Sequence, residues 1–358
     1  MRLRHKPRLG LATPKHATMC LLPPDAGSGR PVMAEIGYTL SSEETGPRDL
    51  VRYASRAEEV GFSFAMISDH FHPWVDRQGH SPFVWSTLGG VAAATERLKI
   101  GTGVTCPTVR IHPAIIAQAA ATTAAMMPGR FSLGVGTGEK LNEHILGDAW
   151  PPVGTRQDML EEAIEVIRGL WEGGLFTHQG RHYTVENARL YTLPEEPPPI
   201  LIAAAGDSAT AMAGRIGDGF IGLVPDPEVI ERFERAGGQH KPRYGQLHVC
   251  WAETEEKARS IAYEWWPNGA IPGNLFIELP LPSHFEEAAS LVSEDDVAEG
   301  VVCGPDPERH LGAIREFIDA GYTHVYVHQV GPDEEGMLRF YEQRVLPELT
   351  SADATVRG

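Results

Sequence analysis

LKIGTGVT at residues 98–105, HPAIIAQAAATTAAM at residues 112–126 and FSLGVG at residues 131–136 follow one another closely along the chain. The first and third segments are short runs rich in apolar residues and glycine, whereas the middle segment has the length and composition of a helix. Strands that are apolar throughout are typical of parallel sheets whose two faces are both covered. The three segments therefore predict a strand, a helix and a second strand parallel to the first.

The same alternation extends in both directions from this unit. Besides the strands Leu98 to Val104 and Phe131 to Gly136, the pattern predicts strands at Glu35 to Leu40, Phe64 to Ser68, Pro199 to Ala204, Gly219 to Val224, Leu247 to Ala252 and His324 to His328. Helices are predicted at Leu50 to Val60, Val84 to Ala94, Pro113 to Met126, Gln157 to Trp171 and Ser208 to Ile216, and a hairpin within Phe176 to Thr192. Eight such units favour an α/β fold, a (β/α)₈ TIM barrel with insertions.

An open doubly wound sheet is the alternative fold. It would carry a phosphate-binding fingerprint directly after the first strand, and the segment Ser41 to Gly46 is not one.

The bulk composition narrows the class of function. The chain has 358 residues, 42% hydrophobic and 22% charged, with a formal net charge of −17. So acidic a surface repels phosphate backbones and anionic lipids, so we expect a small-molecule partner and neither nucleic acid nor membrane. No apolar stretch has the length of a membrane span or the form of a signal peptide, which predicts a cytoplasmic protein.

The regular pattern begins near Met33. We expect a disordered N-terminal extension at residues 1–32 with no assigned role, one barrel domain at residues 33–350 and a C-terminal tail at residues 351–358. The four cysteines are scattered without a CxxC pair, which favours neither a disulfide framework nor a zinc site, and no metal is expected. They are Cys20, Cys106, Cys250 and Cys303.

The active site of a barrel lies at the carboxyl ends of its strands. The second predicted strand ends in Ser68-Asp-His-Phe-His-Pro-Trp74. His70 is our candidate base, because an imidazole accepts a proton near neutral pH and a neighbouring carboxylate can fix its tautomer. His72 and Trp74 are weaker candidates, although Trp74 can lean on a flat ring. The alternative is that Asp69 and His70 only satisfy the loop backbone.

Glycines end two further strands. Gly134-Val-Gly-Thr-Gly138 precedes Glu139, which can be a shelf for a planar cofactor with an inward carboxylate, or a simple tight turn. Gly103-Val-Thr105 ends the third strand in a similar way. After the fifth strand, Ala203 to Ser208 can hold a phosphate on free N–H groups or can be an ordinary helix cap.

The chain lacks the usual motifs for phosphoryl transfer, zinc hydrolysis and serine acyl transfer, namely GKS/T, HExxH and GxSxG. Redox chemistry with a bound cofactor is the class of reaction that remains.

Taken in order, these motifs resemble one family. Ser68 to Trp74, Gly103 to Thr105, His112 to Gln118, Gly134 to Glu139 and Gly217 to Phe220 are similar to the luciferase-like superfamily, specifically its coenzyme F420-dependent glucose-6-phosphate dehydrogenase group. The resemblance covers Glu35 to Leu349. It implies a (β/α)₈ barrel, a homodimer, and the deazaflavin F420 at the barrel mouth.

The resemblance also implies roles for single residues. His70 would accept the proton of the substrate hydroxyl, Glu139 would be the proton partner of the cofactor ring nitrogen, and Trp74 would support the reacting species. Gly103 and Val104 match the place of a non-prolyl cis peptide behind the ring. The residues expected at the cofactor are Asp69, Gly103, Val104, Thr105, Gly138, Asn142, Ala204, Ala205, Gly206 and Asp207.

One departure from the family pattern concerns the substrate. The sugar-phosphate enzymes hold the phosphate with lysines and an arginine, but this chain has no Lys or Arg from Ser260 to Glu308, a segment rich in Trp, Ile, Leu and Phe. We therefore expect a substrate without phosphate. The alternative is that the apolar segment packs on the barrel or on a dimer partner.

The predicted activity is hydride transfer between a C–OH substrate and F420, or the reverse reduction. One alternative is a flavin-dependent monooxygenase of the same superfamily that uses FMN. Another is a non-catalytic cofactor-binding protein, against which the presence of His70, Glu139 and Trp74 argues.

Overall fold

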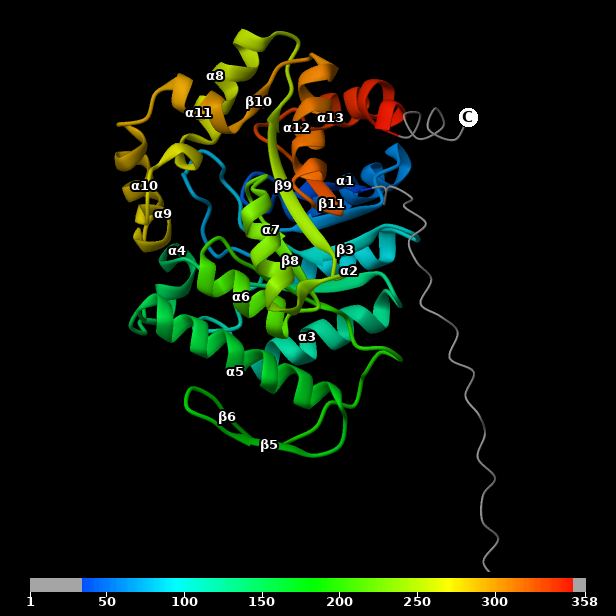
Figure 1. Cartoon of the computed structure of the whole chain (residues 1–358), viewed down its shortest axis with the longest axis vertical. Helices are drawn as coiled ribbons and strands as arrows, with labels where there is room; N and C mark the ends of the chain where they lie inside the picture. Colours follow the sequence, from blue (N-terminus) through cyan, green and yellow to red (C-terminus); the bar gives the residue numbers. More distant parts are fainter. Residues whose placement is uncertain (1–33, 350–358) are drawn as a thin grey trace, which may run out of the picture. The chain divides into compact units, whose positions relative to one another are not determined.

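The computed structural model describes residues 34–349, and within them eight parallel strands form a closed barrel (Figure 1). Each strand pairs with its neighbours in the order β1, β2, β3, β4, β7, β8, β9, β11, and β11 pairs again with β1. The strands are β1 Glu35–Leu40, β2 Phe64–Ile67, β3 Lys99–Thr102, β4 Phe131–Val135, β7 Ile200–Ala203, β8 Gly219–Gly222, β9 Arg243–Cys250 and β11 His324–Gln329. The predicted barrel is confirmed. The open sheet is wrong, because β8 pairs with β9 and closes the ring.

Helices connect successive strands. They are α1 Pro47–Val60, α2 Val84–Ala94, α3 Pro113–Met126, α5 Val153–Trp171, α6 Asp207–Ile216, α7 Pro227–Phe233 and α12 Pro307–Asp319, and α13 Glu334–Phe340 follows the last strand. Their apolar faces pack on the outside of the barrel and form the main core with the outward side chains of the strands. Helix α1 shows the pattern behind this: Leu50, Ala54, Ala57 and Val60 are its buried residues, and Gly61 ends it with a φ of 107°.

Two insertions interrupt the barrel pattern. Strands β5 Phe176–Gln179 and β6 Thr184–Ala188 form the predicted hairpin. The longer insertion lies between β9 and the short strand β10 Val302–Cys303, which pairs with the carboxyl end of β9. It contains α8 Glu255–Trp265, α9 Leu275–Glu278, α10 Pro282–Ala289 and α11 Glu294–Gly300. These helices pack around a second core that includes Trp74, Trp266 and Phe285.

Two predicted boundaries are wrong. Strand β9 begins at Arg243 rather than Leu247, because Arg243 to Gly245 pair with β8 and Tyr244 to Gln246 pair with β11, although the segment is polar. Helix α5 begins at Val153 rather than Gln157. Its first turn contains Gly154 and Thr155, whose weak helix propensity concealed the start.

The inner side chains of the barrel fill its amino-terminal half. Phe64 and Met66 of β2, Ile221 of β8 and Tyr326 of β11 form an inner cluster, with Tyr244 of β9 packed against it. A Cβ on Gly37 would lie 2.5 Å from the Phe64 ring, so only glycine fits there. The next inward residues toward the carboxyl end therefore surround the barrel mouth.

The expectations for residues 1–32 and 351–358, and for Cys20, lie outside the described residues. Cys106, Cys250 and Cys303 are buried and unbridged, as expected for space-filling residues. Across residues 34–349 no helix combines the length and apolar character needed to span a bilayer. The cytoplasmic location stays a prediction.

Candidate active site

His70 lies at the mouth of the barrel and is held by a carboxylate. Its Nδ1 lies 3.1 Å from Oε1 of Glu43, and the side chains of His70 and Glu43 are 11% and 4% exposed. The other oxygen of Glu43 accepts hydrogen bonds from Ser68 Oγ at 2.7 Å and Ser41 Oγ at 3.2 Å. Nδ1 also hydrogen-bonds to the carbonyl oxygen of His72 at 3.3 Å. Because both oxygens that Nδ1 faces can only accept, Nδ1 carries the proton and Nε2 of His70 is left as the basic nitrogen.

Sequence reasoning missed Glu43. The signal was present, because Glu43 stands directly after the first strand, in the segment Ser41 to Gly46 that was inspected only for a phosphate fingerprint.

Asp69 does not orient His70. Its Oδ2 accepts a hydrogen bond from Thr105 at 2.8 Å, and its Oδ1 lies 3.0 Å from Nη2 of Arg110. Arg110 also donates its backbone N–H to Glu143 at 2.7 Å. Burial raises the pKa of Glu143, whereas the pKa of Arg110 rises because Asp69 and Glu143 outweigh the effect of burial. The buried group Asp69, Arg110, Glu143 therefore fixes Thr105 and the loops after β2 and β3.

The peptide bond between Gly103 and Val104 is cis, at the place that the resemblance implies. Val104 packs close to the end of β4, where a Cβ on Gly136 would lie 2.8 Å from its Cγ2. Gly138 has a φ of 75°, and a Cβ there would lie 2.5 Å from Cys106 Sγ. The glycines that end β4 are required by these contacts.

Two side-chain groups beside these glycines, the Glu139 carboxylate and Nδ2 of Asn142, have no hydrogen-bond partner among the described residues. Glu139 precedes α4, Lys140–Glu143, and its carboxylate does not cap that helix. Oδ1 of Asn142 accepts hydrogen bonds from the backbone N–H groups of Phe71 at 2.9 Å and His72 at 3.1 Å, while its buried Nδ2 has no hydrogen-bond partner. His72 itself is tied to the carbonyl of Leu141 by Nδ1 at 2.9 Å. Asn142 thus presents an unused donor, whereas His72 anchors the loop.

The amino-terminal end of α6 is open. Gly206 is its N-cap and supplies no side chain, and residues 205–208 are exposed. The Asp207 carboxylate lies 3.0 Å from Arg232, and Ala204 is half-buried at the end of β7. The first N–H groups of the helix are consequently free of a side-chain cap.

Trp74 is covered by the long insertion. Its ring stacks on Phe276 of α9 with centroids 4.2 Å apart and meets His70 edge-on at 4.8 Å. Helix α9 also contacts α4, and Figure 1 shows α9 and α4 on the same side of the barrel. The guanidinium of Arg156 lies over Trp150 at 4.0 Å and 3.6 Å from Glu278 of α9. The apolar segment therefore packs on the barrel, as the alternative interpretation held, and it covers Trp74.

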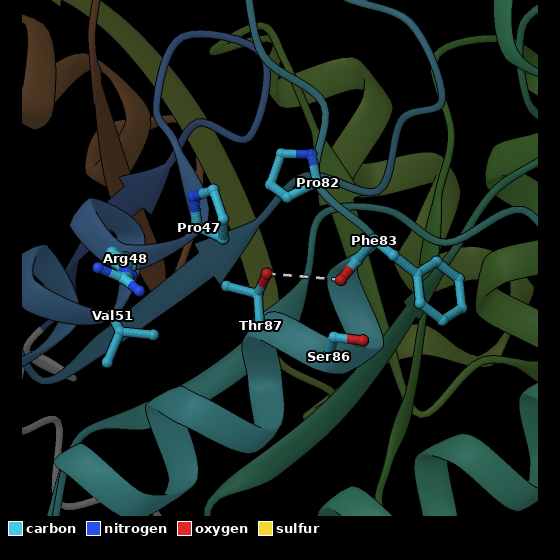
Figure 2. Close-up of a pocket in the computed structure, with 7 residues that line it drawn as sticks. All are labelled: Pro47, Arg48, Val51, Pro82, Phe83, Ser86 and Thr87. Atoms are coloured by element: carbon cyan, nitrogen blue, oxygen red, sulfur yellow. Dashed lines mark hydrogen bonds between the residues drawn. The ribbon is translucent and has the colours of Figure 1, made fainter.

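A groove of about 520 Å³ lies between the first turns of α1 and α2, and Figure 2 shows the residues that line it. Its walls include Pro47, Arg48, Pro82 and Phe83, and the Thr87 hydroxyl is bonded to the carbonyl of Phe83. None of the mouth residues described above lines it. It is therefore not the candidate site. No group of three or more potential metal ligands occurs among residues 34–349.

The sequence model of the luciferase-like monooxygenase family matches residues 30–324. The chain belongs to this family. It is 37% identical over 325 residues to an F420-dependent glucose-6-phosphate dehydrogenase of Microbacterium testaceum, covering 87% of this chain and 96% of that protein. It is also 37% identical to the F420-dependent hydroxymycolic acid dehydrogenase of Mycobacterium tuberculosis, covering 89% of each.

Among solved structures, an F420-dependent secondary alcohol dehydrogenase in complex with an F420-acetone adduct superposes with a TM-score of 0.82 at 30% identity, covering 87% of this chain and 98% of that one. These similarities confirm the luciferase-like family and the resemblance to its F420-dependent dehydrogenases that the motifs predicted.

Proposed function

We propose that this family member is an F420-dependent dehydrogenase that moves a hydride between a C–OH carbon and the cofactor, and that its substrate carries no phosphate. The enzyme is an oxidoreductase acting on CH–OH, and F420 is its cofactor, as the names of the relatives indicate. F420 therefore takes the place of FMN, the cofactor of the alternative monooxygenase.

The mouth residues fit F420. Asn142 offers a buried, unpartnered Nδ2 donor, and Glu139 offers a carboxylate free for a proton. Gly103, Val104 and Gly138 bring backbone close to a planar ligand, and the open end of α6 at Ala205, Gly206 and Asp207 suits a phosphate group. Asp69 contributes by fixing Thr105. When bound, F420 supplies a ring carbon that accepts hydride and reacts poorly with oxygen.

The catalytic work of the chain is proton transfer and positioning. Nε2 of His70 accepts the hydroxyl proton as the C–H bond breaks and the carbonyl forms, and Glu43 stabilises the imidazolium that results. Glu139 exchanges the proton that the ring nitrogen needs. Trp74, fixed between His70 and Phe276, offers an apolar wall to the reacting carbon.

The insertion segment Ser260 to Glu308, which covers Trp74 and is called the cover below, supports a substrate without phosphate. A phosphate dianion needs charge-assisted donors, and the segment Ser260 to Glu308 that forms the cover contains no Lys or Arg. Arginines from outside the segment that reach it are paired with its acids. Arg156, whose side chain is only 2% exposed, lies against Glu278, Arg77 pairs with Glu264, and Arg259 pairs with Glu294. The proposal thus departs from the relatives named for glucose 6-phosphate and is closer to those named for a hydroxymycolic acid or a secondary alcohol.

Anaerobic assays with F420 test the proposal. The purified protein is given F420 and then isopropanol, cyclohexanol or glucose 6-phosphate, and reduction is followed by loss of the visible deazaflavin absorbance. We expect F420 to bind and to be reduced with the alcohols but not with the sugar phosphate. A higher kcat/KM for glucose 6-phosphate contradicts the substrate, and a failure to bind F420 contradicts the whole proposal.

We also propose that the protein is a homodimer. Helices α2 and α3 lie side by side on the outside of the barrel, and neither contains a charged residue. Ile115 and Met126 of α3 are 57% and 50% exposed. A helix that is apolar all round is normally covered. Light scattering should give twice the monomer mass, and Ile115→Glu should give the monomer.

A further inference from the structure

Besides His70, two neighbouring histidines, His248 of β9 and His328 of β11, lie inside the barrel mouth. Inward positions alternate along β9 and β11, and Tyr244 and Tyr326 belong to the inner cluster or pack on it. His248 and His328 come two or four residues later on the same strands and therefore point inward as well. In the order of the strands, β9 stands across the barrel from β3, so His248 faces the loops that carry the cofactor-binding candidates.

The two histidines are linked to a carboxylate that the proposed chemistry does not use. Nδ1 of His248 lies 2.9 Å from Nδ1 of His328, and Nε2 of His328 lies 3.4 Å from Oε2 of Glu44. The side chains of His328 and Glu44 are both 2% exposed, and among the described residues neither Glu44 oxygen nor Nε2 of His328 has a hydrogen-bond partner. Trp266 packs against both imidazole rings, with centroids 5.1 Å from His248 and 4.8 Å from His328.

His248, in contrast to His328, keeps part of its surface exposed. An inward side chain at the carboxyl end of a barrel strand reaches solvent through the mouth. Nδ1 is engaged by His328, so the remaining ring nitrogen, Nε2, is the polar atom that His248 can offer to a ligand.

The carboxylate sets the tautomers along this chain. The negative charge of ionised Glu44, 3.4 Å from Nε2 of His328, favours a proton on that nitrogen, and Nδ1 of His328 must then accept. The proton between the two Nδ1 atoms consequently belongs to His248, whose Nε2 carries a lone pair. Burial of most of the ring, and then the neighbouring His328, lowers the pKa of His248, which favours the neutral ring with this lone pair.

We infer that His248 is a specificity-determining residue whose Nε2 accepts a hydrogen bond from a second hydroxyl of the substrate, with His328 and Glu44 as its positioning residues. The inference rests on the proposed dehydrogenase function. His70 and Glu43 already serve the reacting hydroxyl, and Glu44 holds a separate imidazole pair at the same mouth. Two acceptor nitrogens, Nε2 of His70 and Nε2 of His248, match an alcohol that carries no phosphate and has a second hydroxyl on the neighbouring carbon, that is, a vicinal diol.

Paired substrates provide the kinetic test. Cyclohexanol and vicinal cyclohexanediol differ by one hydroxyl, and one such hydrogen bond changes kcat/KM by about tenfold. We expect the enzyme to prefer the diol by about that factor. His248→Phe should abolish the preference through a higher KM for the diol, and His248→Gln, which retains an acceptor oxygen, should restore part of it. F420 affinity and the cyclohexanol reaction should change by less than about twofold.

Glu44→Gln, which removes the charge that sets the tautomers, should lower the diol preference, because kcat/KM should fall more for the diol than for cyclohexanol. The control is His240→Asn at an exposed histidine, which should leave the preference intact. Absence of a diol preference in the unchanged enzyme, or equal losses on both alcohols in His248→Phe, would overturn the inference.

A measurement without turnover separates this inference from the proposed function. In protein labelled with ¹⁵N-histidine, nitrogen NMR should show His248 protonated at Nδ1 and bare at Nε2, and the Nε2 signal should shift when cyclohexanediol is added. The Glu44→Gln variant should lose the single tautomer. A proton on Nε2 of His248 in the unchanged protein would overturn the inference, whether or not F420 is reduced.

Discussion

Glu43 and Glu44 are adjacent in the chain and serve different imidazoles. Glu43 lies against His70 and Glu44 against His328, so one turn after β1 supplies both carboxylates. Burial raises the pKa of Glu44, and the nearby charge of Glu43 adds to the effect, whereas His328 opposes it. Glu43 and Glu44 can both remain buried because each carboxylate lies against its own imidazole, His70 or His328.

At the residue scale, His70→Gln tests the proposed base. A glutamine keeps a polar side chain but does not take up the hydroxyl proton, so kcat for cyclohexanol should fall by about a hundredfold to ten-thousandfold. F420 binding, followed by fluorescence titration, should be retained. A variant that keeps more than about a tenth of kcat excludes His70 as the base.

Arg110 provides a stability test at the same scale. Arg110→Met leaves the buried carboxylates of Asp69 and Glu143 without their cation and should cost about 3–5 kcal/mol in urea unfolding. Arg52→Met is the control, because Arg52 pairs with Asp49 at the surface and such pairs contribute less than about 1 kcal/mol. If both variants lose the same free energy of unfolding, the buried group of Asp69, Arg110 and Glu143 does not stabilise the fold.

At the scale of single elements, α9 decides how the mouth is closed. This single turn contacts Trp74 through Phe276 and Arg156 through Glu278. Burial lowers the pKa of Arg156, while Glu278 opposes the shift, which indicates that the ion pair compensates for a desolvated guanidinium. The long insertion thereby holds α9 against both the β2 loop and α5.

Phe276→Ala removes the stack on Trp74. An aromatic pair contributes about 0.5–1.5 kcal/mol beyond its buried area, so KM for cyclohexanol should rise by about threefold to tenfold with little change in kcat. Leu275→Ala is the control, since Leu275 lies beside Phe276 on α9 but is 48% exposed. If both variants keep the original KM, α9 is not part of the substrate site.

At the scale of the whole domain, buried histidines couple folding to pH. His310 is fully buried, with its Nδ1 3.0 Å from the Tyr341 hydroxyl and its Nε2 3.0 Å from the Gly304 carbonyl. Burial lowers its pKa from 6.5 to about 4. As the pH falls below 6.5 the unfolded chain takes up this proton first, so the stability that His310 contributes is present above 6.5 and is lost toward pH 4.

The corresponding prediction uses His310→Gln. The variant should be less stable than the unchanged protein at pH 7, and this deficit should shrink by about 2 kcal/mol at pH 5, because glutamine does not titrate. Urea unfolding at both pH values measures the difference, with the exposed His240→Asn as the control. A deficit that is the same at both pH values contradicts the lowered pKa.

The sequence by itself determined the barrel and part of its mouth. Parallel strands that are apolar throughout and helices with one buried face are local patterns, and they predicted all eight strands. The rule that active sites lie at the carboxyl ends of strands led to His70 and Glu139, because these residues follow strands closely, whereas Asn142 came from the family resemblance.

Only the tertiary structure decided which of these groups touch. The contacts of Glu43 with His70, Glu44 with His328, and Phe276 with Trp74 join residues from different strands and loops. Asp69 likewise stands next to His70 in the sequence but is bound by Arg110 and Thr105. Such pairings depend on barrel closure and on the direction of each side chain, and no local periodicity contains that information.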